Sequence, residues 1–260
     1  MKINFGNVSN DYAKYRDRLP EVLFEQLKEK GITFKNKEII ELGAGTGIVS
    51  RHLVEYGAKV IGIEPSIELI EEAAQIDRNL KVSNIKYILS TAEDFEYAQV
   101  VPLIIAVRAW HWFNRSEVLS NIEKYLENDG HLIVINSIFK PDSEIAKMTF
   151  EVLTNNQIVL KPAGSNADAV ERKMGFPLHW FNEWESHSLQ LVDAWQQDYM
   201  LEFTHEEWCG KIRSVSWLTN ESDQSKTIIT NELIDRLSPF DGVLKIPHQY
   251  SIAILRHSKL

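Results

Sequence analysis

The stretch IIELGAGTG, residues 39–47, decides the fold of this chain. Its apolar first half has the composition of a strand and runs directly into three glycines at alternate positions, Gly43, Gly45 and Gly47. Backbone without side chains lets another molecule approach closely. Seventeen residues after Gly47, a second apolar run, 60–63, ends on Glu64. A carboxylate at the end of a second parallel strand can bind a ribose diol, so the two segments predict a site for a nucleoside cofactor.

The spacing of the glycines separates two kinds of cofactor. In the dinucleotide-binding pattern, the third glycine stands three positions after the second, which brings a helix N-terminus to the pyrophosphate. Here Gly45 and Gly47 are two positions apart. The spacing therefore disfavours a nicotinamide-dependent oxidoreductase, which we keep as a third hypothesis.

Strand-length apolar runs alternate with helical patterns along the first half of the chain. We expect strands at 38–42, 58–63, 85–89, 100–107 and 131–135, and helices at 48–54, 66–74 and 116–126. Gly57 is placed to end the first helix, Ser66 and Ser116 to begin the others, and the pair at 129–130 to form a turn. This alternation is typical of βαβ units in an α/β fold with a parallel sheet.

The pattern changes after residue 140. Residues 141–191 are rich in aromatic side chains and helical in spacing, and strand character returns at 194–203. Thr204 and Glu207 have the spacing of a capping box, which predicts a helix start. A further helix at 223–237 and a strand at 249–255 complete the chain. Two late strands separated by helices fit the antiparallel end of a mostly parallel sheet.

Composition limits the class of partner. The chain has 260 residues with 28 basic and 37 acidic side chains, a formal net charge of −9, so we expect no nucleic acid partner. It has no apolar run near the roughly 18 residues that span a bilayer, and no signal peptide pattern, which predicts a cytoplasmic protein without a membrane partner. The single cysteine, Cys209, fits a reducing compartment and a packed side chain better than a nucleophile.

The glycine loop resembles motif I of the class I S-adenosylmethionine (SAM) methyltransferases. Five further segments stand in the order seen in the small-molecule family often labelled methyltransferase type 11, in particular its subgroup with a His-Trp pair after the fourth strand. These segments are 11–16, 63–66, 91–94, 109–113 and 126–130, and the resemblance covers most of residues 5–137.

The resemblance implies a Rossmann-like class I fold for the whole chain. Its sheet would have seven mostly parallel strands with an antiparallel C-terminal strand and a helical lid insertion. Residues 1–260 would form one domain, with the core at about 30–140 and 190–260 and the lid at about 1–25 and 141–190.

The resemblance also assigns the cofactor, SAM, with S-adenosylhomocysteine as product. The expected cofactor-binding residues are Tyr15, Glu41, Gly43, Ala44, Gly45, Gly47, Glu64, Pro65, Thr91, Ala92, Glu93 and Arg108. Many relatives have Asp where this chain has Thr91, so either the Thr91 hydroxyl or the Ala92 amide is expected to meet adenine, and a plain polar loop is the alternative for Thr91. Arg108 stands where relatives often have Gln, which would suit an anionic substrate or a simple salt bridge.

The residues expected on the substrate side are mostly aromatic: Tyr12, Arg16, Trp110 and Trp112. His111, between the two tryptophans, is the candidate general base, and a packing role is its alternative. Trp180, Trp184, Trp208 and Trp217 could line a pocket or fill the core. His179, His187 and His205 lack metal-ligand spacing, so we expect no metal.

Methyl transfer from a sulfonium needs positioning more than acid or base help, because the leaving group departs neutral. The resemblance therefore implies in-line methyl transfer to a small organic molecule, and we expect a monomer or homodimer. A SAM-binding protein with a regulatory or other non-methyltransferase role is the alternative, because fold and cofactor site alone do not define a reaction.

Overall fold

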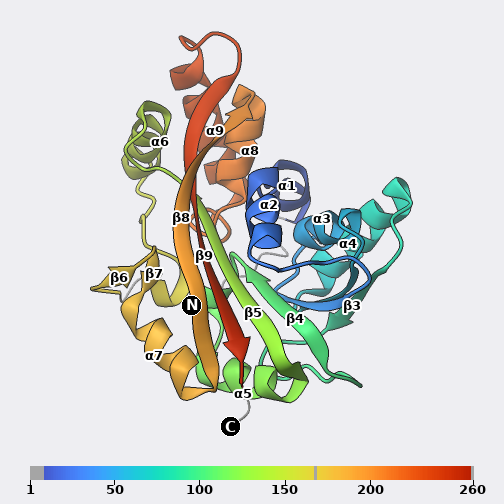
Figure 1. Cartoon of the computed structure of the whole chain (residues 1–260). Helices are drawn as coiled ribbons and strands as arrows, with labels where there is room; N and C mark the ends of the chain where they lie inside the picture. The colour runs from blue at the N-terminus through green and yellow to red at the C-terminus, as the bar shows by residue number, and fades with distance from the viewer. Residues whose placement is uncertain (1–8, 167–168, 259–260) are drawn as a thin grey trace. The chain divides into compact units, whose positions relative to one another are not determined.

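A computed structural model describes residues 9–166 and 169–258, without the side chains of residues 9, 10 and 12. Seven strands form the main sheet, in the order β3-β2-β1-β4-β5-β9-β8 (Figure 1). Their bounds are β1 Glu38–Leu42, β2 Lys59–Glu64, β3 Ile85–Leu89, β4 Val101–Val107, β5 Leu126–Phe139, β8 Leu189–Phe203 and β9 Leu244–His257. The sheet is mostly parallel and its C-terminal strand is antiparallel, which confirms the expected class I fold.

The strand order reverses at β1: the strands that follow it in the chain first extend the sheet on one side, through β2 and β3, and then on the other side, from β4 onward. β1 pairs in parallel with β2 on one side and with β4 on the other, and Glu41 lies in register with both Gly62 and Ile105. The chain therefore leaves β1 and β4 toward opposite faces of the sheet. In open α/β sheets, the carboxyl ends of the strands at such a point form the usual ligand crevice.

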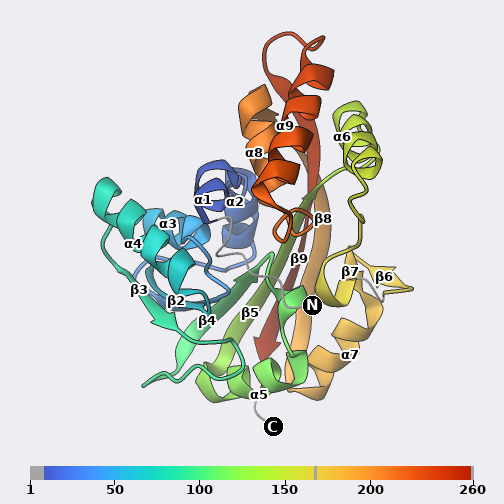
Figure 2. The same cartoon turned by 180° about the vertical axis from the view of Figure 1, so that it is seen from behind.

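Helices connect these strands. Their bounds are α1 Ser9–Tyr15, α2 Glu21–Glu29, α3 Ile48–Glu55, α4 Ile67–Leu80, α5 Arg115–Tyr125, α6 Glu144–Asn155, α7 Leu178–Ser186, α8 His205–Arg213 and α9 Asp223–Leu237. The hydroxyl of Ser66 accepts a hydrogen bond from the amide of Leu69 and so caps α4, as expected. The capping box of Thr204 and Glu207 at α8 is also confirmed. Figure 2 shows α3 and α4 beside β2 and β3.

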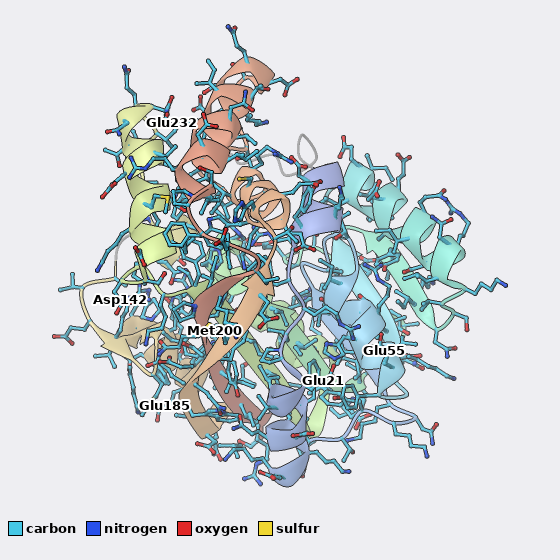
Figure 3. The ribbon with its side chains drawn as sticks, turned by 90° about the horizontal axis from the view of Figure 1, so that it is seen from above. Glu21, Glu55, Asp142, Glu185, Met200 and Glu232 are labelled. Atoms are coloured by element: carbon cyan, nitrogen blue, oxygen red, sulfur yellow. The ribbon has the colours of Figure 1, made fainter. Side chains whose placement is uncertain are left out.

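Helix α2 is attached to α3, the helix that follows the glycine loop. The carboxylate of Glu21, labelled in Figure 3, is 2.9 Å from Nε2 of His52 and accepts a 2.5 Å hydrogen bond from the hydroxyl of Tyr56. The ring of Phe24 stacks on Tyr56 with centroids 4.9 Å apart. These contacts hold α3, the helix at the end of the loop, against a second helix.

The contacts of the chain divide it into two compact units. Unit 1 contains residues 1–17, 138–163 and 198–249, and unit 2 contains 18–137, 164–197 and 250–260. Each has its own apolar core: α6, α8 and α9 supply most of the core of unit 1, and β1, β2, β4, β5, α5 and α7 supply most of that of unit 2. The expected division into a core and a lid stays a prediction, because its boundaries differ from those of the two units.

Three strands are longer than their apolar runs indicated. β5 begins at Leu126 instead of residue 131, because residues 129–130 form a bulge within the strand rather than a turn before it: Val101 pairs with Leu126, but Leu103 pairs with His131. Asp129 has a positive φ of 62° there. β8 and β9 likewise begin five residues early, and a short hairpin, β6 Arg172–Lys173 and β7 Phe176–Pro177, interrupts the region expected to be helical.

Candidate functional site

The glycine loop at residues 43–47 lies at the carboxyl end of β1 and is fixed to the end of β2. The amides of Gly43 and Ala44 donate to the carbonyl of Ile63 at 2.9 and 3.0 Å. Gly43, Gly45 and Gly47 have φ values of 74°, 56° and 74°, a region that glycine adopts far more readily than other residues.

Two of these glycines also lie too close to neighbouring atoms for a side chain. A Cβ at Gly43 would lie 2.6 Å from Cβ of Ala109, and one at Gly47 would lie 2.0 Å from the hydroxyl oxygen of Tyr87. The glycines are therefore required by backbone conformation and by packing, before any ligand is considered.

Glu64 ends β2 with its carboxylate against this loop. One oxygen accepts a hydrogen bond from the amide of Gly45 at 2.9 Å, and the other accepts one from the amide of Ser66 at 3.0 Å. The residue is only 6% exposed, and burial raises the pKa of its carboxyl while the two backbone bonds oppose that shift. A carboxylate can accept about four hydrogen bonds, so Glu64 has capacity left for a diol.

Glu41 is a second buried carboxyl, in β1 two residues before the loop. The hydroxyl of Ser50, in the first turn of α3, donates a hydrogen bond to it. Burial raises the pKa of Glu41 to about 8, and the bond from Ser50 and the charge of Arg51 oppose this only in part. Glu41 therefore carries a proton for much of the time at neutral pH.

Thr46, between Gly45 and Gly47, carries a hydroxyl that makes no hydrogen bond to the part of the chain that the structure describes. The residue is 1% exposed, so this hydroxyl is buried. Buried polar groups are nearly always paired, so an unpaired hydroxyl within a loop of glycines indicates a place where a bound molecule completes the structure.

The segment after β3 is held by its own side chains. The hydroxyl of Thr91 donates to the carboxylate of Asp94 at 2.9 Å and accepts from the amide of Asp94 at 3.2 Å, the pattern of a local polar turn. Ala92 is buried, and the carboxylate of Glu93 accepts from the amide of Asn114 at 2.7 Å. The roles of Thr91, Ala92 and Glu93 toward adenine stay predictions, with the Thr91 hydroxyl already engaged. Pro65 is exposed beside Glu64.

Arg108 follows β4 in an unusual conformation. Its φ is 55°, its amide donates to the carbonyl of Ile135 at 2.8 Å, and its guanidinium donates to the hydroxyl of Ser137 at 3.3 Å. The two bonds tie it to β5, so the end of β4 is set by backbone and side chain together. Whether Arg108 meets cofactor or substrate stays a prediction.

The aromatic residues after Arg108 separate into core and surface. Trp110 is 2% exposed, with its ring 6.2 Å from that of Trp184 in the core of unit 2, whereas Trp112 is 36% exposed. His111 is half-buried, its ring 4.7 Å from that of Trp112, and its carbonyl accepts a 3.2 Å bond from the hydroxyl of Ser165. The structure thus favours a core role for Trp110 and leaves Trp112 and His111 as candidates for the substrate side.

The predicted site residues from the N-terminal segment belong to unit 1. Tyr15 is buried, and its hydroxyl donates to the carboxylate of Glu206 at 2.7 Å. The guanidinium of Arg16 donates to the carbonyl of Ser214 at 3.2 Å. Tyr12 belongs to α1, but its side chain lies outside the described residues. The assignment of these three residues to the site stays a prediction.

Sequence reasoning missed the polar residues that pack behind the loop, Ser50, Arg51, Asp77 and Tyr87. Ser50 and Asp77 lie on buried positions of α3 and α4. A polar residue on the apolar face of an amphipathic helix is the signal that could have found them.

The family of the chain follows from comparison with known proteins. A family model described as "Methyltransferase domain" matches residues 33–204, and the chain belongs to this family. A methyltransferase-named protein of Dictyostelium discoideum is 33% identical over 131 residues, 50% of this chain and 47% of that protein. An uncharacterized methyltransferase of Mycobacterium bovis is 25% identical over 134 residues, 51% of each chain. The chain thus spans about half the length of the curated relatives it matches.

Solved structures support the fold. A type II methyltransferase structure from Anaeromyxobacter dehalogenans aligns with a TM-score of 0.60 at 16% identity, over 94% of this chain and 98% of that one. The YcgJ protein from Bacillus subtilis gives a TM-score of 0.56 at 14% identity, over 93% of this chain and 100% of that one. A Haemonchus contortus N-methyltransferase, in complex with phosphomonomethylethanolamine and S-adenosylhomocysteine, gives 0.56 at 13% identity, over 98% of this chain and 57% of that one.

Membrane-spanning helices and metal-binding clusters are both absent from the described residues. No helix among residues 9–166 and 169–258 has the length and apolar character to cross a membrane. The same part of the chain contains no group of three or more His, Cys, Asp or Glu side chains that could hold a metal ion. The expectations of a cytoplasmic location and of no metal stay predictions.

The residues at the ends of β1 and β2 fit a SAM molecule. Glu64 retains acceptor capacity for the two ribose hydroxyls, and the unpaired hydroxyl of Thr46 can bond to the polar amino-acid end of the cofactor. The glycine loop presents backbone instead of side chains. The chemistry of this donor and acceptor set therefore agrees with the family.

Proposed function

We propose that this chain transfers a methyl group from SAM to a small organic molecule. The observation that carries the proposal is the carboxylate of Glu64, buried at the carboxyl end of β2 and hydrogen-bonded to the amide of Gly45. An ionisable group is not buried against a glycine loop without a cost, and a ribose diol is the ligand that would use its remaining acceptor sites.

SAM supplies an activated methyl group on a positively charged sulfur. Glu64 would accept hydrogen bonds from the ribose hydroxyls, and the loop at residues 43–47 would lie along the amino-acid end, next to the hydroxyl of Thr46. The protein would align acceptor, methyl and sulfur and exclude water, which is enough for a displacement with a neutral leaving group. Glu64 and the loop both belong to unit 2.

On the substrate side, His111 is the candidate to orient or deprotonate an oxygen or nitrogen nucleophile. Its half-buried position beside the exposed Trp112 supports this role. The net charge of −9 supports a small molecule rather than a nucleic acid as substrate. We propose a monomer or homodimer in the cytoplasm as the working form.

The test has two stages. Isothermal titration first measures whether the full chain binds SAM and S-adenosylhomocysteine. Incubation with SAM labelled with tritium in the methyl group and a fractionated metabolite extract then measures transfer to small molecules. We expect binding followed by label in a low-mass fraction. Binding without transfer to any fraction would favour a SAM-binding protein of another role, and absence of binding would overturn the proposal.

The variant His111→Ala tests the base once a substrate is known. We expect SAM affinity within a few-fold of the wild type and turnover lower by roughly 100-fold, the usual scale for loss of a general base. His179→Ala is the control, since His179 lies on α7, which supplies none of the proposed site residues. Normal turnover per folded molecule in His111→Ala would show that His111 only packs and that catalysis rests on positioning.

A further inference from the structure

Three side chains from three different elements meet behind the glycine loop. Arg51 on α3 lies with its Nη1 2.9 Å from Oδ1 of Asp77 on α4. The hydroxyl of Tyr87 on β3 donates to the other oxygen of Asp77 at 3.0 Å. The second nitrogen of Arg51, Nη2, donates to the backbone carbonyl of Thr46 at 2.8 Å. The cluster therefore ends on the loop itself.

We propose that Arg51 is a positioning residue for SAM, which sets the conformation of the loop through the carbonyl of Thr46. Asp77 and Tyr87 fix the orientation of Arg51. This inference rests on the proposed function, because the loop is the part of the chain that would lie against the cofactor.

The geometry of the guanidinium is the first argument. Its planar fork of donors keeps two acceptors at a fixed angle, so Arg51 holds the carboxylate of Asp77 and the carbonyl of Thr46 in one arrangement. Both oxygens of Asp77 are occupied, by Arg51 and Tyr87, which prevents the carboxylate from turning. The side chains of Arg51 and Asp77 are each only 12% exposed, so solvent screens this pair far less than a surface pair.

The second argument is the freedom of the loop. Its glycines give it more conformational freedom than other residues would, so contacts from outside the loop are needed to fix it. Two contacts remove that freedom on either side of the Gly45–Thr46 peptide: Glu64 accepts from the amide of Gly45, and Arg51 donates to the carbonyl of Thr46. The amide that Glu64 binds and the carbonyl that Arg51 binds flank the hydroxyl of Thr46. Loss of the Arg51 contact would therefore loosen the part of the loop that presents this hydroxyl.

Gly47 provides the third argument. A Cβ there would lie 2.0 Å from the hydroxyl of Tyr87 and 3.0 Å from Nη1 of Arg51. The cluster is thus packed directly against the backbone of Gly47, in addition to its bond to Thr46. Two successive loop residues are in contact with it.

The experiment compares two substitutions of one residue. Arg51→Ala removes both contacts, whereas Arg51→Lys keeps a cation for Asp77 but lacks the fork that reaches two acceptors at once. We expect Arg51→Ala to weaken S-adenosylhomocysteine binding about 10-fold or more in isothermal titration. Arg51→Lys should recover most of the melting temperature of the wild type but little of the affinity.

A second ion pair of unit 2 gives the matched control. Arg115 on α5 bonds the carboxylate of Glu183 on α7 at 2.5 and 2.8 Å, and neither residue is in the loop. Arg115→Ala should lower the melting temperature about as much as Arg51→Ala and leave cofactor affinity within about 2-fold. Hydrogen exchange of the cofactor-free chain should be faster at residues 44–48 in Arg51→Ala and unchanged there in Arg115→Ala.

Three results would count against this role. Unchanged affinity in folded Arg51→Ala, with wild-type binding intact, would overturn the positioning role and leave the proposed function standing. Equal losses of affinity in Arg51→Ala and Arg115→Ala would reduce Arg51 to a stabilising residue and overturn the role as well. Absence of cofactor binding by the wild type would overturn both proposals together.

Discussion

The glycine loop of unit 2 and helix α1 of unit 1 differ in the contacts that fix them. The loop is fixed by backbone groups and by residues near in sequence: the amide of Gly45 bonds a carboxylate only 19 residues away. Helix α1 is fixed by side chains far along the chain, since Tyr15 bonds Glu206 across 191 residues and Asp11 bonds Arg213 across 202. The first kind of structure leaves a motif in the sequence, and the second does not.

The α1 and α8 contact nevertheless has its own specific geometry. A Cβ at Gly210, within α8, would lie 2.2 Å from the ring of Tyr15, so the glycine makes room for that ring. Arg213 donates two hydrogen bonds to Asp11, at 2.7 and 3.0 Å. Lys211 is buried in an ion pair with Asp17. Charge and shape together attach the N-terminal segment to this helix.

The largest effect is expected in the loop, from Gly45→Val. A β-branched residue is strained at the φ of 56°, and its side chain would occupy the space in which we propose that the cofactor binds. Titration should detect no SAM binding, while circular dichroism stays close to that of the wild type. Gly31→Val is the control, because Gly31 also has a positive φ of 82° but no atom within 4 Å of its Cβ position. Tight binding by Gly45→Val would show that the loop has another role.

The next effect is expected from Glu64→Ala. Loss of hydrogen bonds to a charged group should weaken S-adenosylhomocysteine binding by about 1.5–3 kcal/mol. The control is Glu68→Ala, because Glu68 bonds the hydroxyl of Ser66 but makes no bond to the loop. Calorimetric titration of both variants measures the difference. Equal affinities in folded Glu64→Ala and the wild type would remove Glu64 from the site.

A pH effect is expected from Glu41. Its pKa of about 8 in the folded chain exceeds the ordinary value of 4.5, so the folded state binds this proton more tightly than the unfolded state does. The free energy of unfolding should therefore fall as the pH rises from about 4.5 to about 8. Glu41→Gln should flatten this decline in urea unfolding, with a remainder from Glu64, whose pKa is also raised. Parallel pH profiles for variant and wild type would show that Glu41 does not cause the decline.

The smallest effect is expected in unit 1, from Asp11→Ala. The ion pair with Arg213 is partly exposed, so its loss should reduce the free energy of unfolding by about 1 kcal/mol or less. Hydrogen exchange should show the change mainly in α1. Lys14→Ala, which removes the exposed pair with Glu206, should have no measurable effect on stability. A global loss of stability in Asp11→Ala would show that α1 supports more of the fold than this pair suggests.

The same contrast explains how far the sequence predicts the structure. β1, β3 and α9 have the expected bounds within one residue, because their apolar periodicity is local. The loop and Glu64 were found because glycine spacing and a following acid form a short-range pattern. β5 extends past its apolar run because pairing with β4 continues through a bulge, which depends on a partner strand. Arg51, Asp77 and Tyr87 were missed for a similar reason, since only the folded chain brings α3, α4 and β3 together.

The measurement that tests the cofactor site most directly is hydrogen exchange of the full chain with and without S-adenosylhomocysteine. We predict slower exchange at residues 43–47 and 64–66 when the ligand is present, because the ligand would lie on that backbone. The contradicting result is ligand binding in titration with unchanged exchange in both segments, which would place the cofactor away from the carboxyl ends of β1 and β2.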